Sequence, residues 1–110
     1  MTYDGPIVVL VDVLSTSSAQ EFAGGLQAIG RAVIIGERTA RRVLVQDIAE
    51  LPTGSIRIYP QGQSLLPDRT VLEGHGVIPD LPVAVHRSDL LAGTDPTLRA
   101  AIDHLQEMDQ

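Results

Sequence analysis

The sequence contains no cysteine and no lysine, and each absence excludes a kind of chemistry. Without a thiol, the chain can form neither a disulfide nor a thiolate metal site, and it has no cysteine nucleophile. All eight basic residues are arginines, whose guanidinium groups stay protonated in proteins. None of these eight side chains can therefore act as a general base.

Basic surfaces, long apolar runs and aromatic residues are also scarce. The formal net charge of −6 argues against nucleic acid or an anionic membrane as a partner, because both need a basic surface. No apolar run approaches the roughly 20 residues of a membrane-spanning helix. The segment around Asp4 does not resemble a secretory signal. With 3% aromatic residues, the core of this single domain must be aliphatic.

A β-α-β unit is predicted for the first third of the chain, which indicates an α/β fold. Residues 6–11 form a short β-branched run, typical of a buried strand. Residues 17–29 place apolar side chains at helical spacing, with Gly30 as a stop signal. Residues 31–35 are the second predicted strand.

A hairpin region is predicted next, over residues 43–51 and 56–59, around a turn at 52–55. Residues 60–82 are rich in Gly, Pro and Asp and are predicted to be mainly loop. A last edge strand is predicted at residues 83–85.

A terminal helix follows, because Asp95 is a good N-cap and Pro96 suits the first helical position. Its apolar stripe is expected to comprise Leu98, Ala101, Ile102 and Leu105. The chain is expected to be part of a larger catalytic domain, or a module completed by another chain, because its first strand has no partner before it. An exposed strand edge favours a homo-oligomer or a strand-exchanged dimer.

The turn Ser15-Thr16-Ser17-Ser18 lies between the first predicted strand and the first helix. Backbone amides at a helix N-terminus are unpaired and favour negative charge, so a hydroxyl there suits acyl transfer. The Ser18 amide could then donate to an oxyanion. The alternative is helix capping, because Ser17-x-x-Gln20 and Ser18-x-x-Glu21 both fit a capping box.

Histidines and acids elsewhere give weaker signals. His75 lies between two glycines, close to Glu73 and Asp80, but this spacing matches no established set of metal ligands. We therefore expect no metal. The loop after the second strand carries a basic cluster, expected by default to be solvated. A carboxylate clamp and a group that tunes the nucleophile are the functional alternatives for Arg38, Arg41 and Arg42.

Residues 11–27 resemble the nucleophile segment of the C-terminal processing (tail-specific) serine peptidases. Residues 30–39, 51–54 and 73–80 and the terminal helix are also similar to that family, in the same order. The resemblance implies a ClpP/crotonase-like fold and a serine endopeptidase that cleaves polypeptides near their C-termini, with no cofactor. It also suggests a periplasmic, cell-envelope or secreted parent protein.

The resemblance assigns roles to individual residues. Ser17 is in the position of the nucleophile, and the Ser18 amide is in the oxyanion site. The family's general-base lysine is replaced by Arg42, which cannot accept the proton. Gln46 matches the family's glutamine, and Arg41 stands where the family usually has glycine.

The tricorn-core and retinoid-binding-protein-like relatives share several of these segments. In tricorn-type enzymes the base is a histidine from an earlier part of the chain, helped by a late glutamate, and Glu73 falls where that glutamate could lie. The resemblance thus implies that residues 1–110 are the C-terminal part of the catalytic domain. The PDZ-like domain and the upstream catalytic segments would lie outside them.

Three functions stay open from the sequence. The first is a serine peptidase that uses Ser17. The second is a non-catalytic peptide-binding or assembly module on a peptidase-like fold, supported by the missing lysine. The third is an acyl-thioester enzyme of the crotonase type, against which the serine-rich turn argues.

Overall fold

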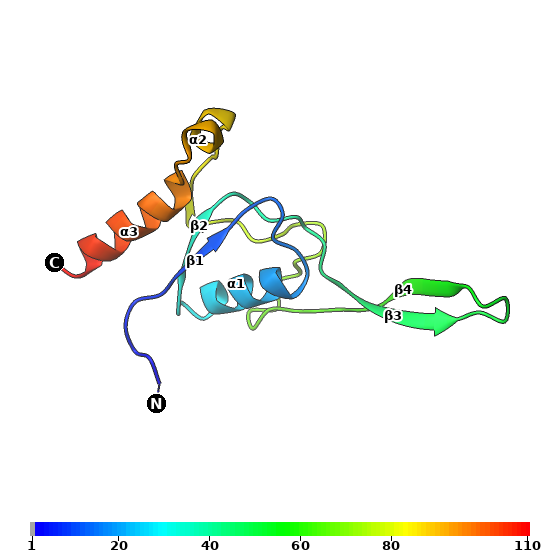
Figure 1. Ribbon diagram of the computed structural model, residues 1–110. Helices are drawn as coiled ribbons and strands as arrows, with labels where there is room; N and C mark the ends of the chain where they lie inside the picture. Colours follow the sequence, from blue (N-terminus) through cyan, green and yellow to red (C-terminus); the bar gives the residue numbers. More distant parts are fainter. Residues whose placement is uncertain (1) are drawn as a thin grey trace.

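The computed structural model describes residues 2–110 and shows a mixed α/β fold, as predicted (Figure 1). Strand β1 (Val8–Val11), helix α1 (Ser18–Ala28) and strand β2 (Val33–Gly36) form the predicted β-α-β unit. β1 and β2 pair in parallel, from Val8 opposite Val33 to Val11 opposite Gly36. Gly30 adopts a φ of 66° just after the helix, which confirms it as the stop signal.

Strand β5 (Leu81–Pro82) completes a three-stranded sheet in the order β1-β2-β5. It lies earlier than the edge strand predicted at residues 83–85, because Asp80 fixes the register. The Asp80 amide donates to the Ile34 carbonyl over 2.8 Å, and the Asp80 carboxylate accepts from the Ile34 amide over 2.7 Å.

The prediction that the first strand is fully buried is wrong. β1 is an edge strand of the sheet, so only Val11 is fully buried, and Leu10 is 41% exposed. Helix α3 (Pro96–Met108) contacts β1 and β2. Figure 1 shows α3 and α1 on opposite sides of these two strands.

The predicted hairpin is confirmed as strands β3 (Leu44–Glu50) and β4 (Ile56–Gln63), which pair antiparallel. β4 extends beyond the predicted limit into the segment predicted as loop. Figure 1 shows the hairpin projecting from the rest of the fold, and the principal extents are 62 × 38 × 28 Å. A β-bulge between Val45 and Gln46 lies at the base of this arm.

The predicted terminal helix is confirmed in α3, and its N-cap is Asp95, whose carboxylate accepts from the Leu98 amide over 2.9 Å. The helix continues to Met108, into the polar C-terminal segment of the chain. The predicted apolar stripe is only partly correct. Ala101 is buried, whereas Leu98 and Ile102 are about half exposed.

Helix α2 (Arg87–Ala92) was not predicted from the sequence. It has six residues, too few to show an apolar stripe at helical spacing, and its side chains Leu90 and Leu91 are both largely exposed. Local bonds define it instead. The Asp89 carboxylate accepts from the His86 amide over 2.8 Å, and Gly93 ends the helix in the left-handed region.

The core lies where α1, β1 and β2 meet the segment around residues 72–77. Its buried members are Val11, Ala23, Ala32, Ile34, Val43, Leu72 and Val77. The apolar stripe predicted for the first helix is partly wrong, because Phe22 and Ile29 are more than 60% exposed while Gln20 is fully buried. Gly24 is buried in α1, where an added side chain would crowd Leu66 and Val77.

None of the helices among residues 2–110 combines the length and the hydropathy needed to cross a bilayer.

Candidate active site

The turn that leaves β1 is organised by Asp12. Its Oδ1 accepts hydrogen bonds from the amides of Leu14 and Ser15, each over 2.9 Å. Such bonds from an Asp side chain to the backbone two and three residues later stabilise a tight turn. The chain is thereby directed from the end of the strand into the start of α1, at Ser17 and Ser18.

Ser17 has φ 53° and ψ −131°, a conformation that residues with side chains rarely adopt. Its side chain makes no capping hydrogen bond to α1, so the capping interpretation of Ser17 is wrong. The Ser17 amide instead donates to the Arg42 carbonyl over 2.9 Å. Ser17 is exposed, and its hydroxyl accepts no hydrogen bond from the amides at the start of α1.

Gln20 is the buried polar link between α1 and the loop that follows β2. Its side chain is 0% exposed. Its Nε2 donates to the Arg42 carbonyl over 2.9 Å, and its Oε1 accepts from the Arg41 amide over 3.1 Å and from the Thr39 hydroxyl. The Thr39 hydroxyl in turn accepts from the Val77 amide over 2.8 Å. The loop is therefore held on two sides.

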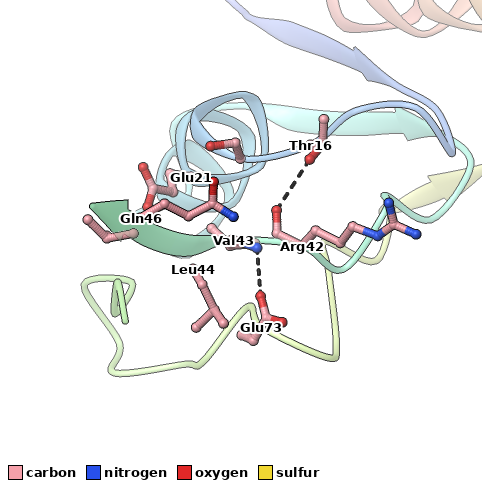
Figure 2. A pocket seen from close by; sticks show the side chains of 9 residues that line it. Thr16, Glu21, Arg42, Val43, Leu44, Gln46 and Glu73 are labelled. Atoms are coloured by element: carbon pink, nitrogen blue, oxygen red, sulfur yellow. Dashed lines mark hydrogen bonds between the residues drawn. The ribbon is translucent and has the colours of Figure 1, made fainter. Parts of the chain in front are cut away.

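The backbone at Arg42 lies directly beside the serine-rich turn at residues 15–18. The Arg42 carbonyl accepts from the Thr16 hydroxyl over 3.3 Å, in addition to Ser17 and Gln20. The next amide, of Val43, donates to the Glu73 carboxylate over 2.7 Å. Figure 2 shows these two side-chain contacts on either side of the Arg42–Val43 backbone. Glu73 thus positions the start of the hairpin.

An open cleft of about 720 Å³ lies over this arrangement. This volume is within the range of small-molecule and peptide-side-chain pockets. The lining residues are Thr16, Ser17, Glu21, Arg42, Val43, Leu44, Val45, Gln46 and Glu73. The structure therefore brings together the four candidate side chains Ser17, Arg42, Gln46 and Glu73 around one cavity.

The arginine of the cleft is oriented outward. Figure 2 shows the Arg42 side chain extending away from Glu21 and Gln46. Gln46 follows the β-bulge, a feature that redirects side chains at the base of a strand.

Glu21 also lines the cleft, although the sequence predicts for it only the role of a capping partner. It lies one helical turn after Ser17 in α1. That spacing was the available signal that it could share a site with Ser17.

The fifth candidate, Ser18, was predicted to act through its backbone amide. Ser18 is the first residue of α1, and among residues 2–110 its amide donates to no backbone acceptor. An unpaired amide at a helix N-terminus is available to a developing negative charge.

The trio of Glu73, His75 and Asp80 does not assemble. The exposed His75 lies outside the cleft lining, with its Nδ1 3.1 Å from the Glu73 carbonyl oxygen. Asp80 is bonded to the Ile34 amide and to the Gln27 side chain. In the described part of the chain, no three potential metal-binding side chains come together.

Comparison with known proteins gives one consistent family. The pattern of peptidase family S41 matches residues 1–83. The carboxyl-terminal-processing protease of Picosynechococcus sp. is 32% identical over 107 residues, which are 94% of this chain and 26% of that protein. Chloroplastic carboxyl-terminal-processing peptidase 3 of Arabidopsis thaliana is 34% identical over 91 residues, 83% of this chain and 17% of that protein.

Structural comparison agrees. The crystal structure of the tricorn protease superposes with a TM-score of 0.86 at 26% identity, covering 96% of this chain and 11% of that one. The chain therefore spans about a quarter or less of the length of these relatives.

The role of the buried amide is testable. We expect Gln20→Leu to lower the free energy of unfolding by about 3 kcal/mol, because it leaves the Arg41 amide and the Thr39 hydroxyl without their acceptor. Urea unfolding measures this change. The matched control is Gln106→Leu on the exposed surface of α3, which should change stability by less than about 0.5 kcal/mol. Equal effects of the two substitutions would contradict the role of Gln20.

Proposed function

The chain belongs to peptidase family S41, and we propose that it provides the nucleophile-bearing part of a C-terminal processing serine endopeptidase. The proposed substrate is a polypeptide, cleaved near its C-terminus as the names of the relatives indicate for them. We assign residues 1–110 to the C-terminal part of the catalytic domain. The parallel β-α-β unit followed by a hairpin supports a ClpP/crotonase-like core.

The observation that carries the proposal is the conformation of Ser17. Ser17 lies at a sharp strand-to-helix turn, has a positive φ and borders an open cleft. Its hydroxyl does not cap the helix. Strained backbone of this kind is found where a hydrolase exposes its nucleophile. A serine with only a structural role would be expected to cap the helix, because an N-cap hydrogen bond typically adds about 1 kcal/mol to the stability of the protein.

The proposed reaction is acyl transfer. The Ser17 oxygen attacks the carbonyl carbon of the peptide, and the Ser18 amide donates to the oxyanion that forms. Collapse of the tetrahedral intermediate releases the amine, which takes up a proton, and leaves an acyl-serine ester. Water then hydrolyses the ester and restores the hydroxyl.

Proton acceptance is the step in which this cleft departs from a serine–lysine pair. No lysine exists in the chain, and no histidine lines the cleft. The Arg42 guanidinium keeps its proton, so its proposed role is to stabilise negative charge. The carboxylates of Glu21 and Glu73 are the groups of the cleft lining that can accept a proton. Gln46 is proposed to orient polar groups of the substrate.

A second function is supported by the same arginine. A peptide-binding or assembly module would keep the cleft and the folded scaffold, and it would not need a base. Arg42 in place of a titratable lysine is the observation in its favour. The two functions differ in whether the Ser17 hydroxyl forms a covalent bond.

Covalent labelling tests the nucleophile. A fluorophosphonate probe should react at Ser17, with a phosphorus–oxygen bond formed and fluoride released, and Ser17→Ala should abolish the mass increase. Ser88→Ala, at an exposed position in α2, is the control and should label as the parent protein does. Intact-protein mass spectrometry gives the readout. Labelling that is absent from the parent, or that survives in Ser17→Ala, would favour the binding module.

The base at position 42 can be restored. We expect Arg42→Lys to raise the labelling rate by at least about tenfold. The backbone of position 42 contacts Ser17, so a flexible lysine side chain can turn into the cleft, where it can lose its proton and an arginine cannot. Arg42→Gln is the matched control, since it removes the charge without supplying a base. A rate that is the same in both variants would contradict the assignment of this position.

We also propose that the protein self-associates through β1, the edge strand with apolar residues. Light scattering should show a dimer, and Leu10→Lys should shift it to the monomer, because a charge on an edge strand opposes pairing. Leu91→Lys, on the exposed surface of α2, should leave the molar mass measured by light scattering at that of the dimer. A monodisperse monomer of the parent protein would refute this proposal.

A further inference from the structure

Arg41 is held in a backbone conformation that disfavours any side chain. Its φ is 61°, in the left-handed region, where a residue other than glycine is less stable by roughly 1 kcal/mol or more. Neighbouring bonds enforce this conformation. The Arg41 amide donates to Gln20 over 3.1 Å, and the Arg41 carbonyl accepts from the Gly74 amide over 3.0 Å. Glycine would meet the same constraint without the penalty.

Two further arginines come from the same short segment. The Arg38 Nε donates to the His75 carbonyl over 2.7 Å, so the two terminal nitrogens of its guanidinium stay available. Arg42 borders the cleft, and its side chain extends away from Glu21 (Figure 2). Arg38, Arg41 and Arg42 are all exposed and are here called the arginine rim.

The arginine rim has little charge compensation within the molecule. Glu37 is the one acid in residues 36–42, and among residues 2–110 no hydrogen bond joins a rim guanidinium to a carboxylate. The whole chain carries a formal charge of −6, so this local excess of positive charge opposes the general sign of the protein. Arg42 is the member of the rim that lines the cleft containing Ser17, whereas the Arg41 side chain lies close to Gly76, next to that lining in the sequence but outside it.

We propose that the arginine rim binds a carboxylate-bearing segment of a peptide that occupies the cleft. A guanidinium matches a carboxylate through two parallel hydrogen bonds, and a segment fixed by backbone bonds loses little entropy on binding. The carboxylates can be those of Asp and Glu side chains or the C-terminal one. The inference rests on the proposed function only in calling this peptide a substrate.

Solvated surface charge is the simpler explanation for an exposed arginine, and it accounts well for Arg38 alone. It does not account for the cluster around Arg41. The exposed Arg69 has a similar φ of 68°, but Arg41 differs in having two further exposed arginines within three residues, one of which lines the cleft. Two hydrogen bonds, from Arg38 to the His75 carbonyl and from the Gly74 amide to the Arg41 carbonyl, also fix residues 38–41 against the turn at residues 73–76. These features indicate that the cation at position 41 serves a ligand.

The experiment measures peptide binding by fluorescence anisotropy, in a Ser17→Ala background so that no peptide is consumed. Four labelled peptides of equal length combine acidic or neutral side chains with a free or an amidated C-terminus. The variants are Arg41→Gly, which removes both charge and strain, and Arg41→Gln, which removes only the charge. Arg99→Gln, on the exposed surface of α3, is the control for net charge.

We expect both Arg41 variants to raise the Kd of the carboxylate-bearing peptides by about three- to fivefold, as for loss of one exposed ion pair. Arg99→Gln should leave the Kd unchanged. Arg41→Gly should also raise the urea midpoint, so that weaker binding cannot come from misfolding. Loss of binding on amidation identifies the C-terminal carboxylate as the ligand, and retained binding identifies the acidic side chains.

Equal affinity for acidic and neutral amidated peptides and for free and amidated C-termini would overturn the inference, as would an equal effect of Arg99→Gln. This outcome is independent of the proposed function, because fluorophosphonate labelling reports on Ser17 alone. A protein that fails to label but binds carboxylates through Arg41 would retain the arginine rim and lose the peptidase assignment.

Discussion

The buried side-chain amide of Gln20 joins the two segments from which the cleft is built. It binds the loop after β2 at three backbone or hydroxyl groups, of Thr39, Arg41 and Arg42, while its own helix begins at the exposed serine turn. A buried amide is stable only when its polar atoms are paired, so the position of the loop is tightly specified. Together with the direct bond from the Ser17 amide to the Arg42 carbonyl, this side chain sets the separation between Ser17 and position 42.

The same link explains where the backbone strain lies. Ser17 and Arg41 both have positive φ, and they are on the two segments that Gln20 connects. Such conformations persist only where surrounding bonds over-determine them. The bonds that hold the serine turn against this loop therefore also hold the Arg41 backbone in the left-handed region.

The chemistry of the cleft is governed by a charge that cannot be titrated. A lysine at position 42 could alternate between neutral and charged forms, whereas an arginine is cationic throughout. Its backbone carbonyl accepts hydrogen bonds from Thr16, Ser17 and Gln20, but its side chain extends outward (Figure 2). In the proposed peptidase, the proton acceptor must therefore be sought among Glu21, Glu73 or groups beyond these residues.

The amino-acid pattern by itself determined the β-α-β unit, the hairpin and the terminal helix, because periodicity, turn residues and the Asp95 cap are local signals. The resemblance to the tail-specific and tricorn-type peptidases pointed to Ser17, Arg42, Gln46 and Glu73, which the tertiary structure places around one cleft. Only the tertiary structure decided whether the Ser17 hydroxyl caps the helix. It also decided that Phe22 is exposed and where β5 begins. These depend on bonds between segments distant in sequence, from Gln20 to Arg42 and from Asp80 to Ile34, which no local pattern encodes.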